Sequence, residues 1–151
     1  MAEVSIPDCE DPGCYARQPI YSITREQIHE VMMNSVNCKQ YIKLQCQGVL
    51  MSWQGDPRSW WVSRDGVQMG YWGGATSRRK GYCACGETNT CIDKSKKCNC
   101  DNNSNNLVTQ DEGYITDKAS LPVKEIRVGD MGDIKELAWH TLGPLVCTGQ
   151  V

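Results

Sequence analysis

Residues 83–101, CACGETNTCIDKSKKCNCD, hold five of the ten cysteines in this chain of 151 residues. Cys91 lies between two Cys-x-Cys pairs, which are Cys83 with Cys85 and Cys98 with Cys100. Zinc-binding cysteines are usually separated by two residues or accompanied by histidines, and both histidines of this chain lie far from the segment. The pattern therefore favours disulfide bonds, with a cluster metal site as the alternative.

The other five cysteines are spread along the chain, as expected of disulfide bonds that connect distant segments: Cys9, Cys14, Cys38, Cys46 and Cys147. Short separations favour two local bonds, Cys9–Cys14 and Cys38–Cys46. Cys147 is alone near the C-terminus and must pair across the fold. Spacing does not determine the remaining pairs.

Ten half-cystines in a chain of this size indicate an oxidising, extracellular compartment. The start, MAEVSIPDCEDPGC, lacks the basic and apolar regions of a secretory signal, so we expect a secreted protein whose signal peptide is absent from this sequence. The net charge is only -2, with no polybasic or acidic tail, and no window holds the roughly 18 continuous apolar residues of a bilayer span. We therefore expect neither nucleic-acid binding nor membrane insertion.

The length fits one domain. We expect residues 1–22 to form an N-terminal segment with its own cysteine pair, and residues 23–151 to form a single domain. A helix is predicted within residues 23–36, where Thr24 and Gln27 can form a capping box. Ile28, Val31 and Met32 then recur at helical spacing, which predicts that this stripe faces the core.

Residues 41–47, YIKLQCQ, alternate with period two, which predicts a half-buried strand with Ile42, Leu44 and Cys46 on one face. Further strands are predicted within residues 59–63, 67–74, 123–130 and 137–147, whereas residues 100–113 are predicted to form a polar loop. The expected fold class is α+β, with one N-terminal helix packed on a small, mostly antiparallel sheet with long loops.

Several motifs occur in a fixed order: WWV (60–62), YWGG (71–74), CACG (83–86), CNCD (98–101), LPV (121–123) and GPLVC (143–147). Their combination resembles the fibrinogen-like region of the contactin-associated, neurexin-like adhesion receptors, over about residues 23–149. The resemblance implies a disulfide-rich, fibrinogen-like fold and a role in adhesion or recognition. This sequence departs from the module because the N-terminal GGW-like part is missing, which suggests a compact, free-standing version.

The leading functional hypothesis is a secreted recognition or adhesion module that binds a protein or glycan partner. Aromatic and arginine side chains dominate binding hot spots, and the Asp65-Gly66 turn is expected to be exposed. The ligand-binding candidates are therefore Trp53, Trp61, Arg64, Asp65, Tyr71 and Trp72. Alternatively, the chain is a structural component that self-associates in an extracellular matrix or secreted assembly without a small ligand.

No cofactor is expected, although Asp93, Asp101 and Asp111 could bind calcium, with a role as polar loop residues as the alternative. Asn102 begins an N-glycosylation sequon, which can also arise by chance in an Asn-rich loop. The common hydrolase motifs are absent from the sequence, so we expect no enzyme activity. A hydrolase would require His140 beside a carboxylate in a cleft.

Overall fold

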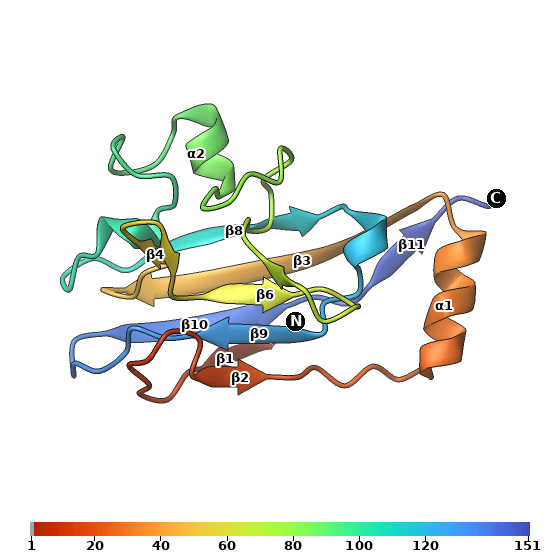
Figure 1. Cartoon of the computed structure of the whole chain (residues 1–151), viewed down its shortest axis with the longest axis horizontal. Coiled ribbons are helices and arrows are strands. Elements are labelled where there is room, and N and C mark those ends of the chain that lie inside the picture. Colours follow the sequence, from red (N-terminus) through yellow and green to blue (C-terminus); the bar gives the residue numbers. More distant parts are fainter. Residues whose placement is uncertain (1) are drawn as a thin grey trace.

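The long strand β3 (Asn37–Gln47) is the centre of the fold in the computed structural model, which describes residues 2–151. Every second residue of β3 is buried, and Ile42, Leu44 and Cys46 are almost completely inaccessible to solvent. The predicted strand and its inward face are therefore confirmed. Figure 1 shows β3 running through the molecule, with α1 at one end and α2 above β8.

Two main sheets and one hairpin make up the β structure, and all strand pairs are antiparallel. The first sheet contains β1 (Glu3–Ser5), β10 (Leu137–Leu142), β3, β11 (Val146–Thr148) and β8 (Thr109–Ile115). The second has the order β2 (Tyr15–Arg17), β9 (Glu125–Val128), β6 (Trp60–Val62) and β7 (Gln68–Met69). The hairpin pairs β4 (Ser52–Trp53) with β5 (Asp56–Pro57). These antiparallel sheets, with few helices, confirm the expected disulfide-rich α+β class.

The N-terminal segment contributes to both main sheets, since β1 pairs with β10 and β2 pairs with β9. These pairings join the predicted segment of residues 1–22 to strands near the C-terminus. Met1 lies outside the described residues. The division of the chain at residue 22 stays a prediction.

Helix α1 (Arg25–Asn34) begins with the predicted capping box. The backbone N–H of Gln27 donates to the Thr24 hydroxyl, and the Gln27 side chain accepts from the Thr24 N–H. Met32 is buried and Ile28 packs against the core, but Val31 is 37% exposed. The prediction that all three residues face the core is therefore wrong for Val31, because α1 lies at one end of the molecule and contacts the core over a narrow face.

The prediction of a polar loop at residues 100–113 is wrong, because this segment contains η1 (Cys100–Asn102) and most of β8. Asp111 of β8 is buried opposite Leu44 of β3. A strand that buries a carboxylate lacks the apolar alternation on which strand prediction depends. Two further short helices, α2 (Ala84–Thr88) and η2 (Lys118–Ser120), were also not predicted.

Five disulfide bonds connect all ten cysteines, so the metal alternative for the cysteine cluster is wrong. The bonds are Cys9–Cys14, Cys38–Cys147, Cys46–Cys100, Cys83–Cys98 and Cys85–Cys91. The predicted Cys9–Cys14 bond and the long-range bond of Cys147 are confirmed. The predicted Cys38–Cys46 bond is wrong, because both cysteines lie on the extended strand β3, eight residue steps and about 27 Å apart, far beyond disulfide reach.

Candidate functional site

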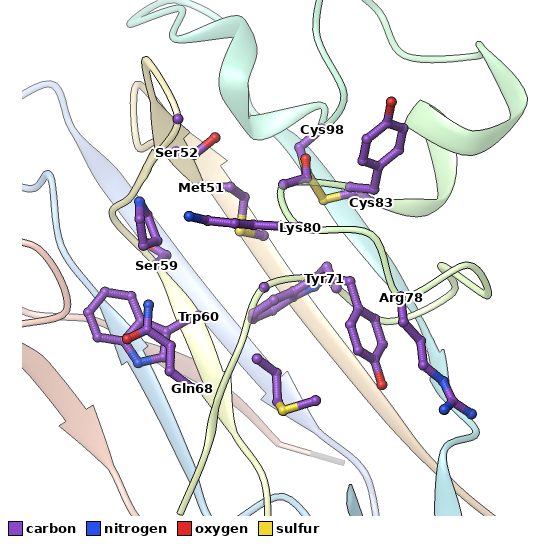
Figure 2. Close-up of a pocket in the computed structure, with 17 residues that line it drawn as sticks. Met51, Ser52, Ser59, Trp60, Gln68, Tyr71, Arg78, Lys80, Cys83 and Cys98 are labelled. Atoms are coloured by element: carbon purple, nitrogen blue, oxygen red, sulfur yellow. A yellow bond between two sulfur atoms is a disulfide. The ribbon is translucent and has the colours of Figure 1, made fainter.

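A hollow of about 520 Å³ opens between the β4–β5 hairpin, β6, β7 and the segment of residues 78–83. Its wall includes the half-buried Trp60 ring together with Met51 and Met69. We call it the Trp60 hollow. Figure 2 shows the Lys80 side chain lying across it, with Trp60 toward one end and the Cys83–Cys98 disulfide toward the other. The hollow thus combines apolar walls with a cation.

The N-terminal disulfide loop fixes the position of Trp60. Gly13, inside the Cys9–Cys14 loop, has a φ of +59° and lies against the Trp60 ring so closely that an added Cβ would overlap it. The Gly13 N–H also donates to the carbonyl oxygen of Arg58, 2.9 Å away. One part of the Trp60 ring is therefore covered by the loop, while another part lines the hollow.

Two buried carboxylates hold the opposite wall in place. Oδ1 of Asp101 accepts hydrogen bonds from the backbone N–H groups of Met51 (2.9 Å) and Ser52 (3.1 Å). Asp111 accepts from the N–H groups of Asn99 (2.8 Å) and Cys100 (2.9 Å). These hydrogen bonds connect β8 to the η1 segment and the η1 segment to β4. The Cys46–Cys100 disulfide joins the same segment to β3.

Burial raises the pKa of both carboxyl groups, because the charged form loses its hydration. The pKa of Asp111 rises to about 6, although the two N–H groups that it accepts from oppose the shift. The hydrogen bonds of the two carboxyl groups fix the backbone of residues 51–52 and 99–100 beside the hollow.

A second hollow, of about 470 Å³, adjoins the first and shares Ser52, Lys80, Gly81 and Tyr82 with it. We call it the Lys96 hollow. Trp53, a residue that is 44% exposed, lies in its wall. Trp53 is the predicted ligand-binding residue that the structure leaves most accessible among the aromatic candidates.

Three of the predicted contact residues belong to the core. Trp61 is 0% exposed, and Tyr71 and Trp72 are also buried. The Trp61 indole N–H donates to the Tyr71 carbonyl oxygen at 2.7 Å, and that of Trp72 donates to the Asp111 carbonyl oxygen at 2.9 Å. The expectation that the Trp61 ring contacts ligand is therefore corrected, because the ring is enclosed. Tyr71 and Trp72 contribute only to the floor of the Trp60 hollow.

Arg64 and Asp65 lie outside both hollows. The Arg64 guanidinium donates to the carbonyl oxygens of Leu121 (2.6 Å) and Ala119 (3.0 Å), so it binds the η2 segment to β6. Asp65 is exposed in the turn, as predicted. A ligand role for these two residues stays a prediction, separate from the hollows.

The structure adds wall residues that the sequence did not single out: Met51, Trp60, Met69, Lys80 and Tyr82. The sequence did indicate that one of the two adjacent tryptophans lies outside the main core, because neighbouring residues of a strand face opposite sides. Nothing local indicated which one. The register of β6 with β9, which sets Trp61 opposite Ile126, makes that choice.

The three candidate calcium ligands do not form a shared cluster in the described chain, where Asp101 and Asp111 accept backbone N–H groups and Asp93 accepts from Ser95. Calcium binding stays a prediction. Cys83 and Cys98 lie near Asp111 but are joined as a disulfide and carry no thiolate.

Glu10, Asp130 and Glu136 form a separate acidic cluster. Burial and the two neighbouring carboxylates raise the pKa of Asp130 to about 6.

The hydrolase hypothesis requires His140 within hydrogen-bond reach of a carboxylate; among the described residues its Nε2 atom instead lies 2.8 Å from the Tyr15 hydroxyl, and its Nδ1 atom has no partner. Burial lowers the pKa of His140 to about 4. No helix in the described part of the chain has the length and apolar character needed to cross a bilayer.

The fold and its five bonds define a disulfide-bonded α+β domain of the kind that forms in oxidising compartments. No protein-family model matches the chain. Over 148 residues, 93% of the chain, it is 34% identical to Neurexin-4 of Drosophila melanogaster. Over 126 residues, 82% of the chain, it is 34% identical to Contactin-associated protein 1 of Rattus norvegicus.

The chain spans only about a tenth of the length of these relatives, 11% and 9% respectively. It is therefore a domain related to one part of each protein. The predicted resemblance to contactin-associated and neurexin-like proteins is confirmed at this level.

Proposed function

We propose that this chain is a secreted extracellular recognition or adhesion domain that binds a protein or glycan partner through the Trp60 hollow. The observation that carries the proposal is the hollow itself, in which a half-buried tryptophan and two methionines surround a space of about 520 Å³. Aromatic anchors in such pockets supply most of the energy of many protein interfaces. Methionine side chains adapt their shape to an incoming group.

The comparisons support a protein partner. One relative carries the name Contactin-associated protein 1, which states an association of that protein with contactin. Both relatives also match most of this chain, so the similarity includes the segments that build the hollow. We propose recognition and not catalysis, because the Nε2 atom of His140 contacts the Tyr15 hydroxyl and His140 does not line the hollow.

The fibrinogen-like assignment and glycosylation are further parts of the proposal. The ordered motifs from WWV to GPLVC support the fibrinogen-like fold. Asn102 is half-buried in η1, and a glycosidase-dependent loss of mass at this residue in protein secreted from animal cells would establish its glycan.

Binding of the tagged domain to intact cells tests the proposal. We expect saturable binding that unlabelled domain displaces, and at least a tenfold loss for Trp60→Ala, because hot-spot truncations cost about 2 kcal/mol or more. Trp139→Ala is the matched control, since Trp139 is also half-buried but lies on β10 outside both hollows. Equal losses for the two variants would refute the assignment of the site.

The alternative function, a structural component that self-associates, makes a different prediction. Light scattering over a wide concentration range would then show dimers or larger species of the domain alone. A strict monomer that binds cells supports the recognition function and contradicts the structural one.

A further inference from the structure

Two short basic segments, RRK at residues 78–80 and KSKK at residues 94–97, are distant in sequence but adjacent in the fold. Cys98 directly follows Lys97 and Cys83 follows Lys80 after two residues, and their disulfide holds the two Cα atoms 4.9 Å apart. The Cys83 N–H also donates to the Lys97 carbonyl oxygen at 3.0 Å. We propose that the surface formed here by Arg79, Lys80, Lys96 and Lys97 binds a sulfated polysaccharide. We call it the basic surface.

Tyr82 organises this surface. The Arg79 guanidinium carbon lies 4.0 Å from the centre of the Tyr82 ring, and the Lys97 ammonium lies 5.5 Å from it. The negative face of an aromatic ring attracts cations at these distances, so a single ring holds two like charges near each other. The cations are thereby positioned before any ligand binds.

The four cations of the basic surface form no ion pair among the described residues, although carboxylates lie near two of them: Glu87 near Arg79, and Asp93 and Asp101 near Lys96. The structure has ion pairs at Lys43, Arg78 and Arg127, and none of them involves the basic surface. Glu87, Asp93 and Asp101 also accept hydrogen bonds from backbone N–H groups, which hold part of their negative charge. All four cations are exposed, although the chain as a whole has a net charge of -2. The surface therefore gathers four exposed cations in one place on a chain whose overall charge is slightly negative.

The shape of the surface favours an extended ligand. Lys80 and Tyr82 line both hollows, so the basic surface connects the Trp60 hollow with the Lys96 hollow. Trp53 in one and Trp60 in the other present aromatic rings on which apolar faces of sugar rings can pack. A linear chain of charged sugars would contact cations in the middle and aromatic rings on either side.

The cation type favours sulfate over the carboxylates of an acidic peptide. Three of the four cations are lysines, which act as compact point charges. Carboxylates are recognised best by the bidentate fork of arginine, and the basic surface contains only Arg79. Sulfate groups repeated along a sugar chain match several separate point charges, so the polysaccharide is the better fit.

This inference rests on the proposed function, because only an extracellular domain would meet such a ligand. It is tested on the purified domain with heparin as the probe. We expect retention on a heparin column at about 150 mM salt, near physiological ionic strength. The variant Lys80→Gln/Lys96→Gln/Lys97→Gln should bind roughly tenfold more weakly in solution, the effect that three screened charge contacts supply together.

The matched control is Lys39→Gln/Lys124→Gln/Lys135→Gln, which removes three exposed lysines away from both hollows. It should bind heparin like the parent. Failure of the parent to bind, or equal losses for the two triple variants, overturns the proposal. Competition by polyglutamate as strong as that by heparin would also overturn it and indicate an acidic protein partner. Cell binding that depends on Trp60 without heparin binding would contradict only this inference and leave the proposed function intact.

Discussion

The hydroxyl oxygen of Tyr15 lies 2.8 Å from the Nε2 atom of His140, and this contact joins residues 125 positions apart. Tyr15 belongs to β2 in the second sheet and His140 to β10 in the first, so the pair connects the two sheets. The rings also pack at a centroid distance of 5.6 Å. The buried imidazole has no partner for Nδ1 among the described residues.

Stability should depend on pH through His140. Burial lowers its folded-state pKa from 6.5 to about 4, so the unfolded chain takes up a proton at a higher pH than the folded one. The stability due to neutral His140 is therefore complete above about pH 6.5 and is lost as the pH falls toward 4. In urea unfolding, the deficit of His140→Gln relative to the parent should shrink from pH 7 to pH 4. A deficit that is constant over this range would contradict the buried neutral imidazole.

Asp111 should show the opposite trend. Its pKa is raised to about 6, so the folded state binds the proton more tightly, and its contribution is complete below about pH 3.8 and lost as the pH rises through 6. Asp111→Asn should lower the free energy of unfolding by about 1–3 kcal/mol at pH 7, because the NH₂ group of the new amide would face one of the two backbone N–H donors. The deficit should be larger at pH 4. Asp56→Asn, in the exposed hairpin, is the control for a simple charge effect.

The disulfides should differ in their contribution to stability. Cys46–Cys100 closes a loop with a sequence separation of 54, and Cys85–Cys91 one of only 6. Loop-closure entropy predicts losses of roughly 4 and 2 kcal/mol when each pair is replaced by serine. Denaturant unfolding of the two double variants measures this order. The reverse order would show that contacts of the folded state outweigh the entropy of the unfolded chain.

The adjacent tryptophans should behave differently when truncated. Trp61→Ala should lose about 3–5 kcal/mol of unfolding free energy, because the ring is fully enclosed and its removal leaves a cavity. Trp60→Ala should lose distinctly less, since part of its ring already faces the hollow. Thermal and urea unfolding of both variants provide the comparison. Equal losses would mean that Trp60 is mainly a core residue.

The YWGG segment should not tolerate a methyl group at Gly73. An added Cβ there would overlap the carbonyl oxygen of Gly113 in β8 and crowd Ile42. We expect Gly73→Ala to cost about 1–3 kcal/mol, as overpacking of a core usually does. Gly70→Ala is the control, because its closest neighbour is the flexible Lys80 side chain. A stability equal to that of the parent would contradict the close approach of these backbones.

Much of the scaffold could be predicted from local patterns. The capping box at Thr24, the alternation along β3 and the Cys9–Cys14 bond all depend on residues close together in sequence, and the structure contains each of them. Strand β8 could not be predicted, because one of its two buried positions is the carboxylate Asp111, and the N–H groups that satisfy it come from another segment.

The candidate site was only partly predictable. The sequence indicated an aromatic cluster, and two of the predicted residues, Tyr71 and Trp72, do line the Trp60 hollow. It did not indicate that Lys80 and Lys96 both line the Lys96 hollow, because the Cys83–Cys98 disulfide brings their two segments together.

By itself, the sequence determined that the cysteines form disulfides, that β3 has a buried face, and that the chain resembles contactin-associated and neurexin-like proteins. These properties follow from composition, short-range periodicity and motif order. Only the tertiary structure decided which cysteines pair, which of Trp60 and Trp61 is buried, and where the lysines gather. Each of these outcomes depends on contacts between residues far apart in the chain, which no local pattern encodes.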